Sequence, residues 1–122
     1  MTTAVELMKG GLSAGAAKAV GGEFATAVSA AGTTLSDATA LVASNSNVTT
    51  VGAASGVRLP NTEIGDEYFI YNGTTTELTV YPPTSSGSIN QIPAGTGMKL
   101  AGYTAVRLKK FTATVWQGWL SA

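Results

Sequence analysis

Short runs of β-branched and aromatic residues, each closed by glycine, proline or asparagine, constrain this chain more than any other feature. The run EYFIYN ends in the turn sequence NGT, and ELTVYPP then reads as a returning strand. We predict a hairpin here, with Phe69 and Tyr71 on one face of its first strand and Val80 in its second. Short strands with turns at such close intervals favour an all-β plan over alternating strands and helices.

The last part of the chain, MKLAGYTAVRLKKFTATVWQGWL, also reads as strands. Val106 and Leu108 fall on one face of such a strand, and Arg107 and Lys109 fall on the other, as in a sheet with one buried face. The sequence therefore predicts a small antiparallel β-sandwich or partly open barrel over residues 35–122.

The first 34 residues have a different character, because they consist mainly of Ala, Gly, Ser and Thr, with paired glycines that oppose a long helix. The stretch has too few large apolar side chains to cover a core alone. A disordered tail is the alternative, although such tails are normally richer in charge and proline. We predict an extended arm over residues 1–34 that needs a partner surface, and the residues expected to contact that partner are Thr2, Val5, Met8, Leu12, Val20 and Phe24.

Histidine and cysteine are both absent from the 122 residues. Their absence removes the commonest general base, the commonest metal ligand and the Ser-His and Cys-His pairs that activate nucleophiles. It also removes disulfides and thiolate zinc sites. We therefore expect a protein that is not an enzyme, with no catalytic residue, no cofactor, no metal and no small-molecule substrate.

Charge is sparse, at 11% of residues, and the seven basic and seven acidic residues cancel. Nothing in this balance favours a nucleic acid or an anionic membrane as partner. The one basic cluster, Arg107, Lys109 and Lys110, is interpreted as the solvated face or edge of a strand. A surface of small uncharged residues packs readily against neighbours, which is typical of an assembly subunit.

No secretion signal is recognised at the start of the chain, where Glu6 interrupts the apolar residues. The apolar runs are too short to cross a bilayer. The expectation is synthesis in a cytoplasm and residence there or in a particle assembled there.

Three weak motifs are interpreted as structural. Asn47 and Asn72 begin glycosylation sequons and are assigned to turns. Glu63, Asp66 and Glu67 lie close together but do not have the spacing of a calcium loop, so a surface loop is preferred.

The aromatic side chains have two possible roles. Tyrosine and tryptophan rings can form a sugar-stacking platform, but aromatic residues in strands more often serve as core or interface anchors. The residues that we expect in the core or in an interface are Phe69, Tyr71, Val80, Tyr81, Leu108, Trp116 and Trp119.

Taken in order, the segments DATAL, VTTV, GVRLP, IGDEYFIYN, ELTVYPP and SIN, followed by a late tryptophan, resemble a β module recurrent in tailed-bacteriophage virion proteins. The resemblance covers about two-thirds of the chain. Proteins with this module include capsid decoration (cement) proteins and parts of tail-fibre or spike appendages. The module's residues have structural roles: strand ends at Leu59, Pro60 and Val80 to Pro82, a hairpin turn at Asn72, and a loop anchor at Ile89 and Asn90.

The resemblance implies a decoration protein, since a chain of 122 residues has no room for a long fibrous shaft. Such a protein would bind the outside of the major capsid protein shell as a homotrimer and stabilise it, after synthesis in the host bacterial cytoplasm. The resemblance thus implies that the six arm residues contact the capsid and that the seven core or interface residues form the core and the trimer contact. A tail, neck or fibre-associated structural protein and a host-glycan adhesion module are the alternatives.

Overall fold

The computed structural model describes residues 23–121, and within that range every regular element is a β-strand. The all-β prediction is therefore confirmed for the described part of the chain. The ten strands are β1 (Phe24–Ser29), β2 (Thr39–Ala40), β3 (Asn45–Thr50), β4 (Gly56–Arg58), β5 (Glu67–Asn72), β6 (Leu78–Tyr81), β7 (Ser88–Ile89), β8 (Met98–Leu100), β9 (Ala105–Lys110) and β10 (Val115–Leu120).

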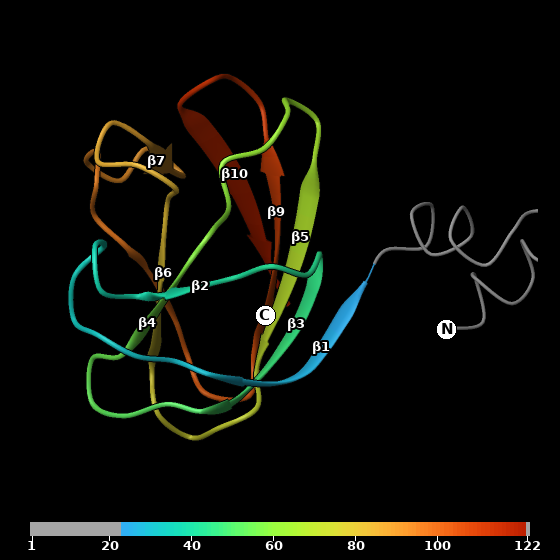
Figure 1. Cartoon of the computed structure of the whole chain (residues 1–122), viewed down its shortest axis with the longest axis vertical. Coiled ribbons are helices and arrows are strands. Elements are labelled where there is room, and N and C mark those ends of the chain that lie inside the picture. Colours follow the sequence, from blue (N-terminus) through green and yellow to red (C-terminus); the bar gives the residue numbers. More distant parts are fainter. Residues whose placement is uncertain (1–22, 122) are drawn as a thin grey trace, which may run out of the picture.

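The strands form two sheets that face each other (Figure 1). The six-stranded sheet has the order β1-β3-β5-β9-β10-β7, and the four-stranded sheet has the order β2-β4-β6-β8. From β1 to β6 the chain enters the two sheets alternately, and each strand pairs in parallel with the next one that enters the same sheet. This arrangement resembles the stacked coils of a β-solenoid, so the predicted antiparallel sandwich or barrel is wrong for this half of the fold.

The predicted hairpin between EYFIYN and ELTVYPP is also wrong, because β5 and β6 lie in different sheets. The neighbours of β5 are β3 and β9, and Phe69 lies beside Asn45 in a parallel register with β3. All four residues of β6 are buried, since this strand lies between β4 and β8. The sequence NGT turns the chain from one sheet into the other and not back along the same sheet.

The end of the chain follows the antiparallel prediction more closely. Strand β9 pairs antiparallel with both β5 and β10, and β8 pairs antiparallel with β6. Val106 and Leu108 face the core as predicted, and Arg107 points outward.

One core lies between the two sheets and receives side chains from both. Of the residues predicted for core or trimer, Val80, Tyr81, Leu108 and Trp116 are buried. Phe69, Tyr71 and Trp119 are exposed, so a core position for them is wrong. In β5 the inward positions belong to Ile70 and Asn72, so the alternating residues Phe69 and Tyr71 point outward.

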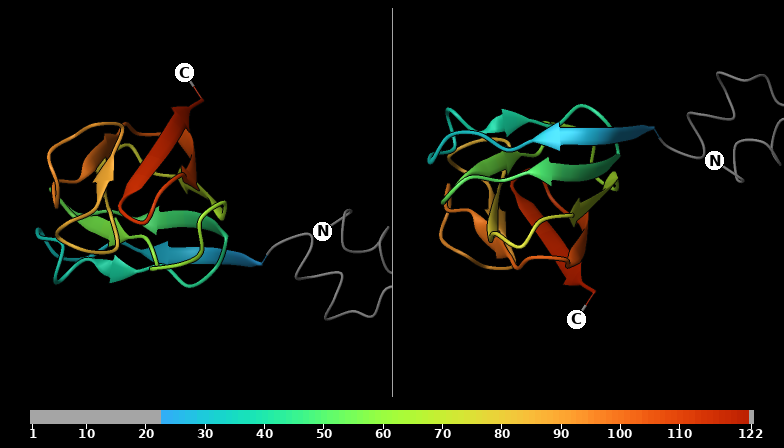
Figure 2. Two further views of the ribbon diagram at one scale, coloured as in Figure 1. Left: turned by 90° about the horizontal axis from the view of Figure 1, so that it is seen from above. Right: turned by 90° about the horizontal axis from the view of Figure 1, so that it is seen from below.

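The sheet begins earlier than the predicted boundary at residue 35. Strand β1 pairs with β3, with Phe24 beside Asn45, and Figure 2 shows it at the rim of the six-stranded sheet. Of the six residues predicted to grip the capsid, only Phe24 is among the described residues. The other five, Thr2, Val5, Met8, Leu12 and Val20, lie outside them.

Two segments of the predicted module are held together by a close contact. The ring of Tyr81 lies over Gly56, where an added Cβ would come within 2.5 Å of the ring, and the Tyr81 hydroxyl donates to the Thr33 carbonyl at 2.9 Å. GVRLP and LTVYPP therefore lie side by side as β4 and β6, and the glycine leaves room for the tyrosine.

Lys110 corrects the interpretation of the basic cluster as a solvated face. Its side chain is only 5% exposed, because Lys110 falls on the same inward face of β9 as Leu108. The ammonium donates to Asn61 Oδ1 at 3.2 Å and to the Thr62 carbonyl. It thereby fastens the loop before β5 to the end of β9.

The SIN segment is anchored through Asn90, and a substitution there tests the anchor. Asn90 Nδ2 donates to the Gly118 carbonyl at 3.2 Å, the Gly118 amide donates to Asn90 Oδ1 at 2.8 Å, and Asn90 has a φ of 53°. Asn90→Ala should lower the free energy of unfolding by about 2–3 kcal/mol, because it removes both hydrogen bonds and puts alanine in a left-handed conformation. Asn90→Gly should recover about 1 kcal/mol of that loss. Urea unfolding followed by circular dichroism measures both, and equal losses would contradict the backbone part of the explanation.

Candidate binding face

A single row of side chains crosses five strands on the outer face of the six-stranded sheet. The strand registers pair Phe24 with Asn45, Asn45 with Phe69, Phe69 with Arg107, and Arg107 with Trp119. We call these five residues the aromatic row. Rings alternate along it with an amide and a guanidinium, because β1, β5 and β10 supply the rings and β3 and β9 supply the polar groups.

The rings of the aromatic row are unusually exposed. Phe24 is 58% exposed, Phe69 46% and Trp119 47%. Tyr71, one outward position along β5 from Phe69, is exposed as well. Large apolar side chains gathered on one face of a protein usually mark a surface that binds something.

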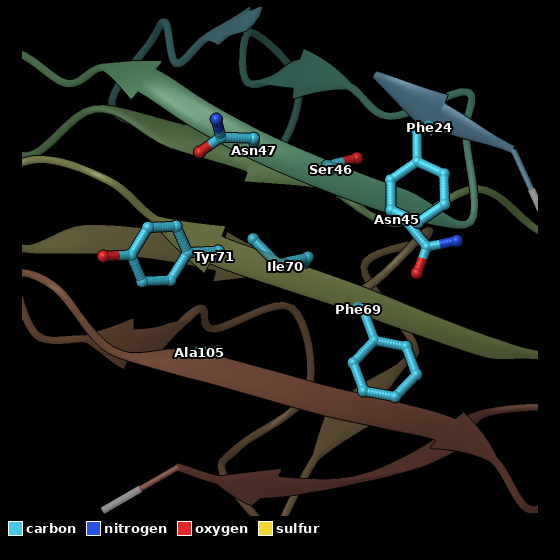
Figure 3. A pocket seen from close by; sticks show the side chains of 8 residues that line it. All are labelled: Phe24, Asn45, Ser46, Asn47, Phe69, Ile70, Tyr71 and Ala105. Atoms are coloured by element: carbon cyan, nitrogen blue, oxygen red, sulfur yellow. The ribbon is translucent and has the colours of Figure 1, made fainter. Parts of the chain in front are cut away.

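The face has two shallow hollows, one on each side of Phe69, each of about 260 Å³. Figure 3 shows the first hollow, where the side chains of Phe24, Phe69 and Tyr71 surround its floor. The second lies between Phe69 and Trp119, with Arg107 at its wall. Phe69 therefore separates two sites of similar size along the row.

Trp119 is held by contacts on two sides. The guanidinium carbon of Arg107 lies 5.3 Å from the centre of the indole, a cation-π distance. The Phe111 ring lies 6.2 Å away at an interplanar angle of 50°. These contacts fix the orientation of the indole although the side chain is half exposed.

The polar groups of the face have unused hydrogen-bonding capacity. Asn45 Nδ2 donates to the Glu23 carbonyl at 3.1 Å, and Asn47 Nδ2 donates to the Thr26 carbonyl at 3.2 Å. Each amide therefore has its nitrogen anchored, while within residues 23–121 its oxygen accepts no hydrogen bond. The Arg107 guanidinium likewise donates to no acceptor in this range. The face offers two acceptors and a fork of donors beside its rings.

Beneath the face, Trp116 packs against Tyr68 with the ring centres 5.9 Å apart. Burial raises the pKa of the Tyr68 hydroxyl, which keeps it neutral. The two tryptophans of the chain therefore have opposite positions, with Trp116 under the sheet and Trp119 on it.

The weak motifs of the sequence lie away from this face or have structural partners. Asn72 is fully buried, which rules out a glycan on it in the folded chain. Asp66 accepts the Glu63 amide at 3.3 Å within a turn, and in residues 23–121 no group of three His, Cys, Asp or Glu side chains is placed to hold a metal ion. In the same range, no helix is long and apolar enough to cross a membrane.

The structure thus brings together four residues that the sequence singled out for different reasons: Phe24 from the predicted arm, and Phe69, Tyr71 and Trp119 from the predicted core or trimer contact. Sequence reasoning missed Asn45 and Asn47, which face the same side because they are two residues apart in β3. The two-residue spacing of these asparagines is visible in the sequence NSNV. Only the parallel pairing of β3 with β5 places Asn45 beside Phe69.

No family model matches the sequence. No curated protein matches it either.

Proposed function

We propose that the chain is a non-enzymatic structural subunit of a bacteriophage virion, a capsid decoration protein that binds the outer surface of the major capsid protein shell. The observation that carries the proposal is the edge position of β1, which among residues 23–121 pairs with β3 on one side and with no strand on the other. Strand β1 forms the rim of the six-stranded sheet, and its sequence FATAVS contains no charged residue and no proline. Edge strands that are meant to stay single are normally protected by lysine or proline.

The register of β1 against β3 is irregular between Ala25 and Val28 and between Val28 and Ser29, but no charge or proline in β1 opposes pairing with a strand of another protein. Half of the peptide groups in an edge strand point away from the sheet and remain free to bond a partner. In the sequence, residues 1–22 precede β1 and hold only three charged residues, Glu6, Lys9 and Lys18. The grip on the shell is therefore assigned to the N-terminal side of the chain.

The chain would stabilise the shell because it binds the assembled state of the capsid protein more tightly than the dissociated state. A protein that binds assembled capsid subunits and not dissociated ones shifts the equilibrium toward the shell. The resemblance to decoration proteins further suggests a homotrimer at threefold positions, in which three grips act together and each need only be modest.

A charge on the open edge tests the proposal. Ala27→Lys places an ammonium on β1, and Ala113→Lys places the same group on the exposed β9–β10 loop as a control. Each variant is added to particles that were prepared without the protein. We expect at least roughly tenfold fewer bound copies of Ala27→Lys than of the unchanged chain, since charged edges resist pairing. The control should bind as the unchanged chain does. Gel analysis of purified particles after incubation measures occupancy.

The cementing role needs a separate measurement. Particles without the chain, or with Ala27→Lys, should release DNA at a lower temperature than fully decorated particles. If all three release DNA at one temperature, the chain does not reinforce the shell. A copy number near roughly six or twelve per particle would instead indicate a closed ring in the tail.

A further inference from the structure

We infer that the aromatic row is a binding site for an extended β-linked polysaccharide, a second function in addition to strand pairing at the β1 edge. The proposal does not depend on attachment to a capsid. It rests on the spacing of the row, on its unused polar groups and on the size of the face.

The spacing of the rings fits a sugar chain. Phe24, Phe69 and Trp119 lie on every second strand of the order β1-β3-β5-β9-β10. Neighbouring strands are about 4.8 Å apart, so successive rings are about 9.6 Å apart. This is close to the length of one disaccharide in an extended β-1,4-linked chain. Each ring can therefore stack under every second sugar.

The polar groups fit the sugars between the rings. A pyranose presents C–H groups on its faces and hydroxyls around its rim, so it needs a ring beneath it and hydrogen-bonding groups beside it. The free oxygens of Asn45 and Asn47 can accept from hydroxyls. The Arg107 guanidinium can donate to hydroxyls, or as a fork to a sugar carboxylate. The two hollows flanking Phe69 give this pattern twice along one line.

The size of the face favours a glycan over a second protein. Five strands span about 19 Å, and six-residue strands are about 20 Å long, which gives a flat area of about 400 Å². A stable protein interface needs about 800 Å² on each partner. A face half that size is sufficient for an oligosaccharide about four sugars long.

Titration of the full chain with cellohexaose and with a β-1,4-linked mannuronate hexasaccharide tests the site. These two probes share the linkage and differ in charge. We expect saturable binding of at least one, measured by calorimetry, with a change in the emission of Trp119. Trp119→Ala and Phe69→Ala should each weaken binding by at least roughly tenfold. Val42→Ala, which removes an exposed apolar side chain outside the row, should leave it unchanged.

The arms of the experiment separate the two sugar chemistries. Binding of the mannuronate alone, lost in Arg107→Gln, places a sugar carboxylate on the guanidinium. Equal binding of both probes indicates that the Arg107 guanidinium contacts neutral hydroxyls and not a carboxylate. Either result supports the site.

Three results would overturn the inference: no binding of either probe at millimolar concentration, binding that persists in Trp119→Ala, or an oligomer that Trp119→Ala dissociates while no sugar binds. The last result would assign the row to a second copy of the chain. Because Trp119→Ala leaves the β1 edge intact, its particle occupancy should equal that of the unchanged chain, so failure here is distinct from failure of the decoration role.

Discussion

Replacing Asn72 by aspartate should lower the free energy of unfolding by about 4 kcal/mol, because the change removes one fully buried amide nitrogen from a satisfied network. Asn72 Nδ2 donates to the Thr76 carbonyl at 2.7 Å and to the Leu100 carbonyl at 3.1 Å. Its Oδ1 accepts from the Thr74 amide at 3.1 Å and from the Thr74 hydroxyl at 2.8 Å. One side chain therefore joins the β5–β6 corner to the end of β8.

Aspartate keeps the shape of the side chain but replaces the donor Nδ2 by an oxygen that can only accept when it is ionised. The buried Leu100 carbonyl and the part-buried Thr76 carbonyl each lose a donor, and a carboxylate oxygen is set against them. Burial among carbonyls favours the neutral acid, so the folded pKa of the introduced carboxyl lies above its unfolded value of about 3.9. The stability deficit should therefore be smallest near pH 4 and should grow as the pH rises through the folded pKa.

Asn47→Asp is the matched control, since both asparagines begin a sequon but Asn47 lies on the surface. It gives up one hydrogen bond, to the Thr26 carbonyl, and should cost less than about 1 kcal/mol. Urea unfolding at pH 4.5 and pH 7.5 measures both variants. Similar losses for the two, or a deficit at Asn72 that does not change with pH, would contradict the assigned network.

How far the sequence predicts this fold depends on which physical signal each element carries. The alternation of Val106, Arg107 and Leu108 records which side of β9 is buried, and the structure agrees. Alternation says nothing about which strand is the neighbour. The run EYFIYN is compatible with a return strand or with a parallel partner from the previous coil, so the hairpin could not be distinguished from the stacked arrangement.

The same limit explains the candidate site. Phe69 and Tyr71 were recognised as important aromatic residues, but their burial depends on whether a second layer covers the outer face of β5. The sequence holds enough apolar side chains to fill one core between two sheets, and Ile70 and Trp116 are among those that occupy it. Period-two patterning identifies the two faces of β5 without stating which of them is covered. Trp116 and Trp119 show the same ambiguity in β10, where the spacing alone does not reveal that one is buried.

The two tryptophans provide the second prediction with a large effect on stability. Trp116→Ala should lower the free energy of unfolding by about 3–5 kcal/mol, because the indole is 1% exposed and its removal leaves a cavity between the sheets against Tyr68. Against a total of about 5–15 kcal/mol for a domain of this size, such a loss takes the variant close to unfolding at 37 °C.

Trp119→Ala removes the same atoms three positions later and should change stability by no more than about 0.5 kcal/mol, because the side chain is 47% exposed and rests mainly on Arg107 and Phe111. Thermal unfolding followed by far-ultraviolet circular dichroism compares the two variants without relying on the indole signal that each loses. The order of the two melting temperatures is the decisive result. If Trp119→Ala melts as early as Trp116→Ala, then Trp119 contributes to folding, and its exposed ring cannot be treated as a group kept for binding. If Trp119→Ala melts with the unchanged chain, the indole is free of a folding role, and any loss of sugar binding in that variant belongs to the aromatic row itself.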